Sequence, residues 1–365
     1  MRFLLIVSFL FLSQNSFAHP MMIRHGYTTC VTCHRSPLGG SLLTDYGKGI
    51  AASLSISPSE YDPEEKSSFE KTLTLNGRIQ HGLQFRGVVL DKNGEWSAFP
   101  MQLDYLNFID FGKGHGFQFE VGRTPNRSDG TRSFLNTLLL RRAVYSYRWK
   151  KKKRGDQITI GRDYLPYGIR IDDHRAYIRF RNRQDVSDVV STIRYDFWRE
   201  NDQSTFFLGA PSGQEVSQNG EWSLGGRYEY YLDSHFSLGG IGLFAHSEVL
   251  NRTLLGLFSR YGNEQYGVLS EYDFNFRNIL NRSDESFFQH SFYLRPFYYP
   301  VEFLEIAFIG ELLYVQSPFL EFNKRLGLGL DLKILRNLTF KTDFRKAWNQ
   351  SLSEDLLMAQ LFLNF

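Results

Sequence analysis

Apolar and polar residues alternate over long stretches of this chain, and this alternation constrains its fold more than any other feature. From Lys71 onward the pattern has a period of two rather than the helical period of about 3.6. The clearest stretch places five apolar residues on one face: Leu326, Leu328, Leu330, Leu332 and Ile334. Charged residues and glycines lie between them, so we expect a strand with one apolar and one polar face.

The alternating stretches are longer than the strands of a soluble β-sandwich. They commonly run for about 10 to 16 residues, whereas the strands of soluble proteins usually have about 5 to 6. About 9 to 11 tilted residues cross a bilayer. The sequence therefore predicts an all-β fold, a transmembrane antiparallel β-barrel formed by residues 71–365.

Turn and loop residues divide this region into strands. Short turns are expected near Lys113, Gly155, Asp202, Asp233, Asn263, Pro300 and Arg336. Mostly longer connections alternate with them, around residue 92 and at residues 124–134, 164–188, 210–220, 248–251, 277–285, 317–322 and 350–353. This alternation predicts about 16 strands and leaves both ends of the barrel on the short-turn side, which faces the periplasm in outer-membrane barrels.

The composition excludes several other classes of protein. Aromatic residues make up 16% and charged residues 22% of the 365 residues. A bundle of membrane helices is excluded because it needs several apolar runs of ~20 residues, and the aromatic content argues against disorder. The formal net charge is only +3, so nothing indicates nucleic acid as a partner.

Residues 1–18 have the pattern of a secretory signal peptide. Arg2 precedes an apolar run at residues 3–12, and Ser16-Phe17-Ala18 forms a cleavage site with small residues at its ends. The apolar run is shorter than the ~17 residues that a membrane anchor needs. We therefore expect a mature chain that begins at His19, outside the cytoplasm.

The two cysteines lie in the sequence Cys30-Val31-Thr32-Cys33-His34, which is the C-x-x-C-H attachment pattern of a c-type haem. Two thiols at this spacing can bond to the two vinyl groups of one porphyrin, and His34 is then the proximal ligand of the iron. We therefore predict one haem c, held by residues 19–70. Two alternatives remain: a redox-active disulfide between the cysteines, and a zinc site to which His25 adds a fourth ligand.

The second axial ligand of the iron is harder to predict. The interval between His34 and the first strand contains no further histidine or methionine. A distal ligand must then come from residues before the motif or from the barrel, or be absent. His25 is the first candidate, and His19, Met21 and Met22 are weaker ones.

The last strand carries the most specific barrel signal. Its apolar face holds Leu357, Ala359, Leu361, Leu363 and the terminal Phe365. This ending resembles the C-terminal assembly signature of bacterial outer-membrane β-barrels, in which the insertion machinery reads a terminal aromatic residue and alternate apolar residues. The resemblance implies an outer-membrane protein, in contact with lipid, with both termini in the periplasm.

The connection at residues 164–188 is similar in position and charge to the third outer loop of the general porins. In that family the loop folds into the lumen as a constriction, and the proteins are often trimers. The resemblance implies both features for this chain. A solvated surface loop remains the alternative.

A covalent haem on a barrel resembles porin–cytochrome electron conduits. Those systems enclose a separate multi-haem wire, whereas this chain carries one haem motif. One porphyrin cannot cover an apolar band ~25 Å tall, so we expect electron transfer at the periplasmic mouth, with a periplasmic or multi-haem cytochrome as partner.

A different class of function remains open. The chain would then be a diffusion porin in which the haem segment is a plug, a sensor or a structural staple. We do not expect an enzyme, because no spacing marks the acid–base group that a haem enzyme would need beside an open iron site.

Overall fold

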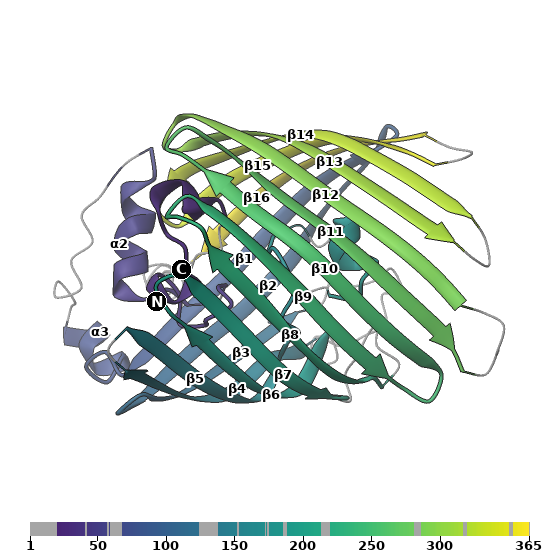
Figure 1. The fold of residues 1–365 in the computed structure, drawn as a ribbon. Helices are drawn as coiled ribbons and strands as arrows, with labels where there is room; N and C mark the ends of the chain where they lie inside the picture. Colours follow the sequence, from purple (N-terminus) through teal and green to yellow (C-terminus); the bar gives the residue numbers. More distant parts are fainter. Residues whose placement is uncertain are drawn as a thin grey trace.

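The structure, a computed structural model, describes residues 20–40, 42–56, 58, 68–123, 138–151, 153–171, 173, 175–184, 188–212, 220–280, 286–316, 320–349 and 353–364. Sixteen strands form a closed barrel in which consecutive strands pair antiparallel and β16 pairs with β1 (Figure 1). The expected fold class and the expected number of strands are therefore confirmed.

The strands are β1 (Ile79–Lys92), β2 (Glu95–Gly112), β3 (His115–Arg123), β4 (Leu138–Lys151), β5 (Arg154–Tyr164), β6 (Val189–Trp198), β7 (Asp202–Ala210), β8 (Trp222–Tyr231), β9 (Phe236–His246), β10 (Leu250–Gly262), β11 (Tyr266–Ile279), β12 (Ser286–Val301), β13 (Leu304–Gln316), β14 (Glu321–Leu335), β15 (Leu338–Trp348) and β16 (Ser353–Asn364). The helices are η1 (Pro20–His25), η2 (Cys30–Thr32), α2 (Asp45–Ser53), α3 (Ser68–Leu73) and α4 (Tyr177–Phe180). Within the described ranges, no helix has the length and apolar character needed to cross a membrane.

The barrel wall is apolar outside and polar inside. Leu328 on β14 is 59% exposed, whereas Glu271 and Asp273 on β11 are each 1% exposed. On β16, Leu361 is exposed and Phe362 is buried. The faces that the period-two pattern predicts are therefore confirmed, and their polarity matches a barrel wall that faces lipid.

The start of the first strand differs from the expectation. We expected strand pattern from Lys71 onward, which includes Leu75, but β1 begins at Ile79. Leu75, Asn76 and Gly77 all have positive φ angles, of 44°, 53° and 85°. They form a turn between α3 and β1, because this left-handed backbone cannot continue into a strand.

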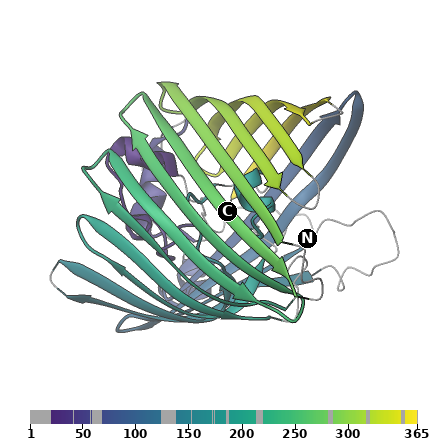
Figure 2. The same ribbon diagram turned by 45° about the vertical axis from the view of Figure 1, so that its right-hand side comes forward.

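The N-terminal segment, residues 20–56, occupies the short-turn end of the barrel. Arg24 pairs with Glu302 of the β12–β13 turn at 2.5 Å and donates to the carbonyl oxygen of Glu264 in the β10–β11 turn. Figures 1 and 2 show this purple segment and α2 together at one end of the barrel. Several expectations lie wholly outside the described residues: the signal peptide at 1–18 with His19, the connection at 124–134, and Phe365. Parts of the connections at 164–188, 210–220, 277–285, 317–322 and 350–353 lie outside them as well.

The constriction loop, residues 165–188 between β5 and β6, folds into the lumen, as its similarity to the third loop of porins implies. Its main chain donates hydrogen bonds to carboxylates of the opposite wall, from Ile169 to Glu271 at 2.6 Å and from Tyr177 to Glu311 at 2.7 Å. Figure 2 shows α4 of this loop inside the barrel. The described part of the loop is therefore not a solvated surface loop.

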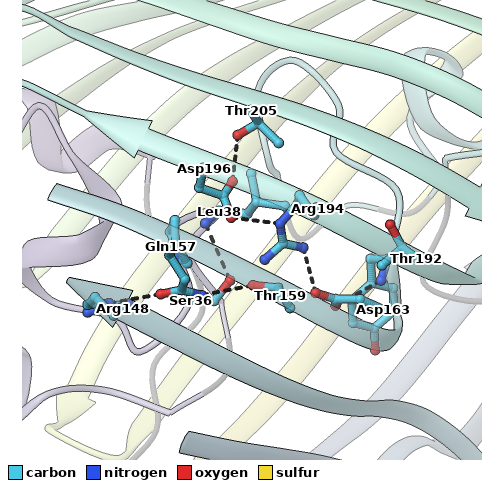
Figure 3. A network of polar contacts seen from close by, with 12 residues as sticks. Ser36, Leu38, Arg148, Gln157, Thr159, Asp163, Thr192, Arg194, Asp196 and Thr205 are labelled. Atoms are coloured by element: carbon cyan, nitrogen blue, oxygen red, sulfur yellow. Dashed lines mark hydrogen bonds and ion pairs between the residues drawn. The ribbon is translucent and has the colours of Figure 1, made fainter. Parts of the chain in front are cut away.

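Buried ion pairs brace the inner wall beside the N-terminal segment. Asp163 accepts from Arg142 at 2.7 Å and from Arg194 at 2.6 Å, and Arg194 also donates to Asp196 at 2.8 Å. Thr205 donates to Asp196 at 2.7 Å (Figure 3). Because these groups are nearly inaccessible, each charge depends on its partner.

Candidate functional site

Side chains of the barrel wall hold the N-terminal segment by its main-chain carbonyls. The contacts join Arg148 to Arg35 at 2.6 Å, Gln203 to Pro37 at 2.8 Å, and Arg260 to Thr28 at 2.9 Å. These donors come from β4, β7 and β10. The segment is therefore fixed to several parts of the wall, on both sides of the C-x-x-C-H motif.

The motif itself forms one tight turn. The carbonyl oxygen of Cys30 accepts from the main-chain N–H of Cys33 at 3.3 Å and of His34 at 2.9 Å. In the 3₁₀ geometry of η2, side chains three residues apart eclipse each other. Both thiols therefore lie on the same side of the turn; both are free and half-buried.

His34 has the hydrogen bonding of a metal-ligating histidine. The side chain is 6% exposed, and its Nδ1 donates to the carbonyl oxygen of Gly40 at 3.1 Å. Its Nε2 has no hydrogen-bond partner among the described residues. Burial and the nearby Arg170 lower the pKa of His34 to about 4, so the imidazole is neutral at pH 7. Metal-binding histidines usually fix their second ring nitrogen on a carbonyl in this way.

A glycine turn brings the Gly40 carbonyl to His34. Gly39 and Gly40 have φ angles of 74° and 68°, which other residues rarely adopt. The chain then returns alongside the motif, where His34 and Leu43 form a β-bridge. The sequence signal for this support is the pair Gly39-Gly40, which follows the motif closely.

Helix α2 packs directly on the motif. Thr44 caps the helix by accepting from the Gly47 N–H at 3.1 Å, and the Thr44 N–H donates to the Cys33 carbonyl oxygen at 2.9 Å. A Cβ at Gly47 would lie 2.3 Å from that same oxygen. Only glycine therefore allows α2 to approach the cysteine turn this closely.

Replacing Gly47 by alanine is expected to loosen the N-terminal segment. The clash with the Cys33 carbonyl costs about 1–3 kcal/mol, more than the ~1 kcal/mol gained by removing a glycine from a helix. Limited proteolysis of the intact protein in detergent should show faster cleavage within residues 42–56. Gly49→Ala is the matched control, because a Cβ at Gly49 meets nothing within 4 Å. Equal protection of the two variants would contradict this packing.

A cavity opens beside the motif. It encloses about 1360 Å³, including space open to solvent, and Cys30, Cys33 and His34 all line it. Much of its wall is apolar: Leu43, Ile50 and Leu54 of the N-terminal segment, Leu165 and Ile169 of the constriction loop, and Phe362 of β16.

The remaining wall is strongly basic. Six cationic side chains line the cavity: Arg170, Arg227, Arg260, Lys333, Arg336 and Lys341. No aspartate or glutamate among the described residues lines it. The cavity therefore combines two thiols and a neutral imidazole with an apolar wall and an excess of positive charge. Sequence reasoning did not place Arg227, Arg260, Lys333 and Arg336 at the site, because they come from several distant strands and turns.

The alternatives for the cysteine pair are not favoured by this geometry. Burial raises the pKa of both thiols, that of Cys33 to about 11, whereas redox-active C-x-x-C pairs need a lowered thiol pKa. In the described part of the chain, no three side chains of His, Cys, Asp or Glu are grouped as a metal ion would require. This finding bears on zinc, which needs four such ligands, and not on haem iron, which takes four from the porphyrin.

His25, the first candidate for the distal ligand, does not line the cavity. Its Nε2 lies 3.4 Å from the Glu302 carboxylate at the β12–β13 turn. Burial and Arg24 lower the pKa of His25 to about 4, so this contact is not an ion pair at pH 7.

The two neighbouring methionines lie in different surroundings. Met22 lines the same cavity as His34. Met21 is 5% exposed and belongs to an apolar cluster with Ile169 of the constriction loop and Phe258 of β10. Met22 is thus the sequence candidate that the structure brings to the motif.

The fold and the site together define a sixteen-stranded barrel of the porin type, whose N-terminal segment forms a basic cavity at one end. Solved structures with this fold include OmpT from Vibrio cholerae lacking loop L8, with a TM-score of 0.62 and 7% identity over 79% of this chain and 99% of that chain. The anion-selective porin from Comamonas acidovorans has a TM-score of 0.60 and 12% identity, over 79% of this chain and 99% of that chain. Salmonella typhi OmpF in complex with daunomycin has a TM-score of 0.62 and 11% identity, over 79% of this chain and 97% of that chain.

At these identities the similarity shows the fold alone. No protein-family model and no curated protein matches the chain.

Proposed function

We propose that this protein is an outer-membrane barrel that carries one covalently attached c-type haem and takes part in electron transfer at its short-turn mouth. The observation that carries the proposal is the cavity at the C-x-x-C-H turn. It presents two thiols on one side of the turn and a neutral His34 whose Nε2 has no hydrogen-bond partner in the described part of the chain.

The residues of the chain have distinct roles at this site. Cys30 and Cys33 would hold the haem through thioether bonds, and His34, oriented by the Gly40 carbonyl, would be the proximal ligand of its iron. The apolar wall keeps water from the macrocycle, and α2 holds the turn through Gly47. Haem bound there would supply a one-electron redox couple.

Met22 is the proposed distal ligand. We expect Met22→Leu to abolish the sulfur-to-iron absorption of the oxidised protein and to lower the midpoint potential, because an axial thioether raises it. Met21→Leu is the matched control and should change neither property, since Met21 packs in the apolar cluster. An unchanged spectrum in Met22→Leu, with a changed one in His25→Ala, would assign the ligand to His25 instead.

The location and partners follow from the barrel. The apolar outer wall and the pattern of β16 support insertion in a bacterial outer membrane, with the short-turn end and both termini in the periplasm. A periplasmic or multi-haem cytochrome is the proposed electron partner. One solved form of Vibrio cholerae OmpT is a trimer, and we propose an oligomer, by analogy a trimer, here as well.

The alternative is a diffusion porin, and the resemblance to channels such as the anion-selective porin favours it. Single-channel conductance in planar bilayers separates the two functions. The electron-transfer proposal expects low conductance, because the constriction loop and the N-terminal segment both occupy the lumen. It also expects a soluble reduced cytochrome to reduce the haem. A large conductance that is independent of redox state, with no electron exchange, would favour the porin.

A further inference from the structure

We propose that Arg170 and Lys333 form a carboxylate-binding subsite in the cavity, occupied by the two propionate groups of the haem. The inference rests on the proposed function, because it names what the chain does for the haem beyond attaching it. It also gives the constriction loop a role: the loop supplies one wall of the haem site.

The charge of the cavity is the first argument. Six cations line it, and no carboxylate of the described residues does. A haem carries two carboxylates at one edge of an otherwise apolar macrocycle. A cavity with an apolar wall and a basic wall therefore matches both parts of this ligand.

The cations of the cavity differ in whether a carboxylate of the protein pairs with them. Arg227 and Arg260 both bond to Glu229, at 2.6 Å and 2.5 Å, and Lys341 pairs with Asp331 at 2.9 Å. Each of these cations therefore already pairs with a carboxylate of the wall, and Arg227 and Arg260 share one.

Arg170 and Lys333 form no ion pair with a described carboxylate. Arg170 donates only to main-chain carbonyls, that of Gly39 at 2.9 Å and that of Leu38 at 3.5 Å. Nζ of Lys333 lies 5.9 Å from the centre of the Tyr299 ring. Both side chains line the cavity, so an anion that enters it can form a charge-assisted hydrogen bond with each of them.

The position of Arg170 connects the subsite to the iron ligand. A Cβ at Gly40 would lie 3.2 Å from its Nη2, and the Gly40 carbonyl accepts from His34. An arginine can hold a carboxylate through two parallel hydrogen bonds. The Arg170 side chain, which bonds to the glycine turn, can therefore also bind a propionate.

The test compares the haem-loaded wild type with Arg170→Gln, Arg170→Lys and Lys333→Gln. Arg199→Gln is the control, because Arg199 is an exposed cation of the β6–β7 turn at the same end and pairs with Asp202. For each purified protein, the haem content per chain and the midpoint potential are measured. The wild type is also titrated with succinate by calorimetry.

We expect Arg170→Gln and Lys333→Gln to lower the midpoint potential well beyond the shift in Arg199→Gln, because each removes a cation that opposes oxidation of the iron. Arg170→Lys should retain most of the wild-type potential. If Arg170→Gln does not fold, the midpoint potential of Lys333→Gln, compared with that of Arg199→Gln, tests the inference. We expect no succinate binding, since the propionates fill the subsite.

Three results would overturn the inference. Haem-loaded variants with the potential of the control would show that these cations do not contact the propionates. Succinate that binds the haem-loaded wild type but not Arg170→Gln would assign the subsite to a free anion. A protein without haem in every sample would refute the proposed function, and this inference with it.

Discussion

Replacing Cys30 and Cys33 together by serine is expected to abolish covalent haem attachment. Serine hydroxyls do not form the thioether bonds, so the pigment should separate from the chain on denaturation. The barrel should still assemble, because its closure rests on the pairing of its strands. The N-terminal segment should still dock, because Arg24, Arg148 and Gln203 hold it through contacts outside the motif. Haem staining of a denaturing gel measures the effect, and the signal should fall to background.

The control lies within the same turn. Thr32 stands between the cysteines and is exposed, so Thr32→Ser changes the motif without touching a thiol or His34. It should retain the full haem signal. Haem that remains bound to the denatured double-serine chain, or that is lost equally from Thr32→Ser, would contradict the assignment of the two thioethers.

Replacing Asp163 by asparagine is expected to destabilise the barrel by about 1.5–3 kcal/mol, because Arg142 and Arg194 lose the carboxylate that they share and keep only their second partners, Glu120 and Asp196. Asp163 is 2% exposed and bonds to both Arg142 and Arg194, which are also buried. The change is nearly isosteric, so packing is retained. Urea unfolding in a lipid environment, followed by tryptophan fluorescence, measures the loss.

An exposed pair at the short-turn end of the barrel gives the comparison. Lys153 and Glu200 lie 3.6 Å apart with side chains 89% and 75% exposed. Solvent screens such pairs, so Glu200→Gln should leave the free energy of unfolding essentially unchanged. Similar losses in both variants would mean that the inner wall is hydrated and that its ion pairs do not brace the barrel.

The period-two pattern predicted most of the barrel because a strand wall imposes the same rule on every residue. Glu271, Asp273 and Phe362 all face the lumen as their position in the alternation requires. The pattern was wrong at Leu75, where a left-handed turn, and not side-chain polarity, determines the backbone. Turn-forming residues located the strand ends, and their spacing predicted the sixteen strands.

The site was predictable only where its parts are close in sequence. Cys30, Cys33 and His34 form a local motif, and the distance of five residues from His25 to Cys30 suggested that histidine as a ligand. The folded segment instead turns His25 toward Glu302 and leaves Met22 at the cavity. Arg170 meets Gly39 across 131 positions, a contact that depends on closure of the barrel and that no local pattern contains.

The absorption spectrum of the purified protein, recorded oxidised and reduced, tests the central claim most directly. The account predicts the reduced α-band of a c-type cytochrome, equivalent to one haem per chain, with the pigment still attached to the polypeptide after denaturation. A correctly assembled barrel that is colourless after expression with c-type haem maturation, or that loses its pigment on denaturation, would contradict it.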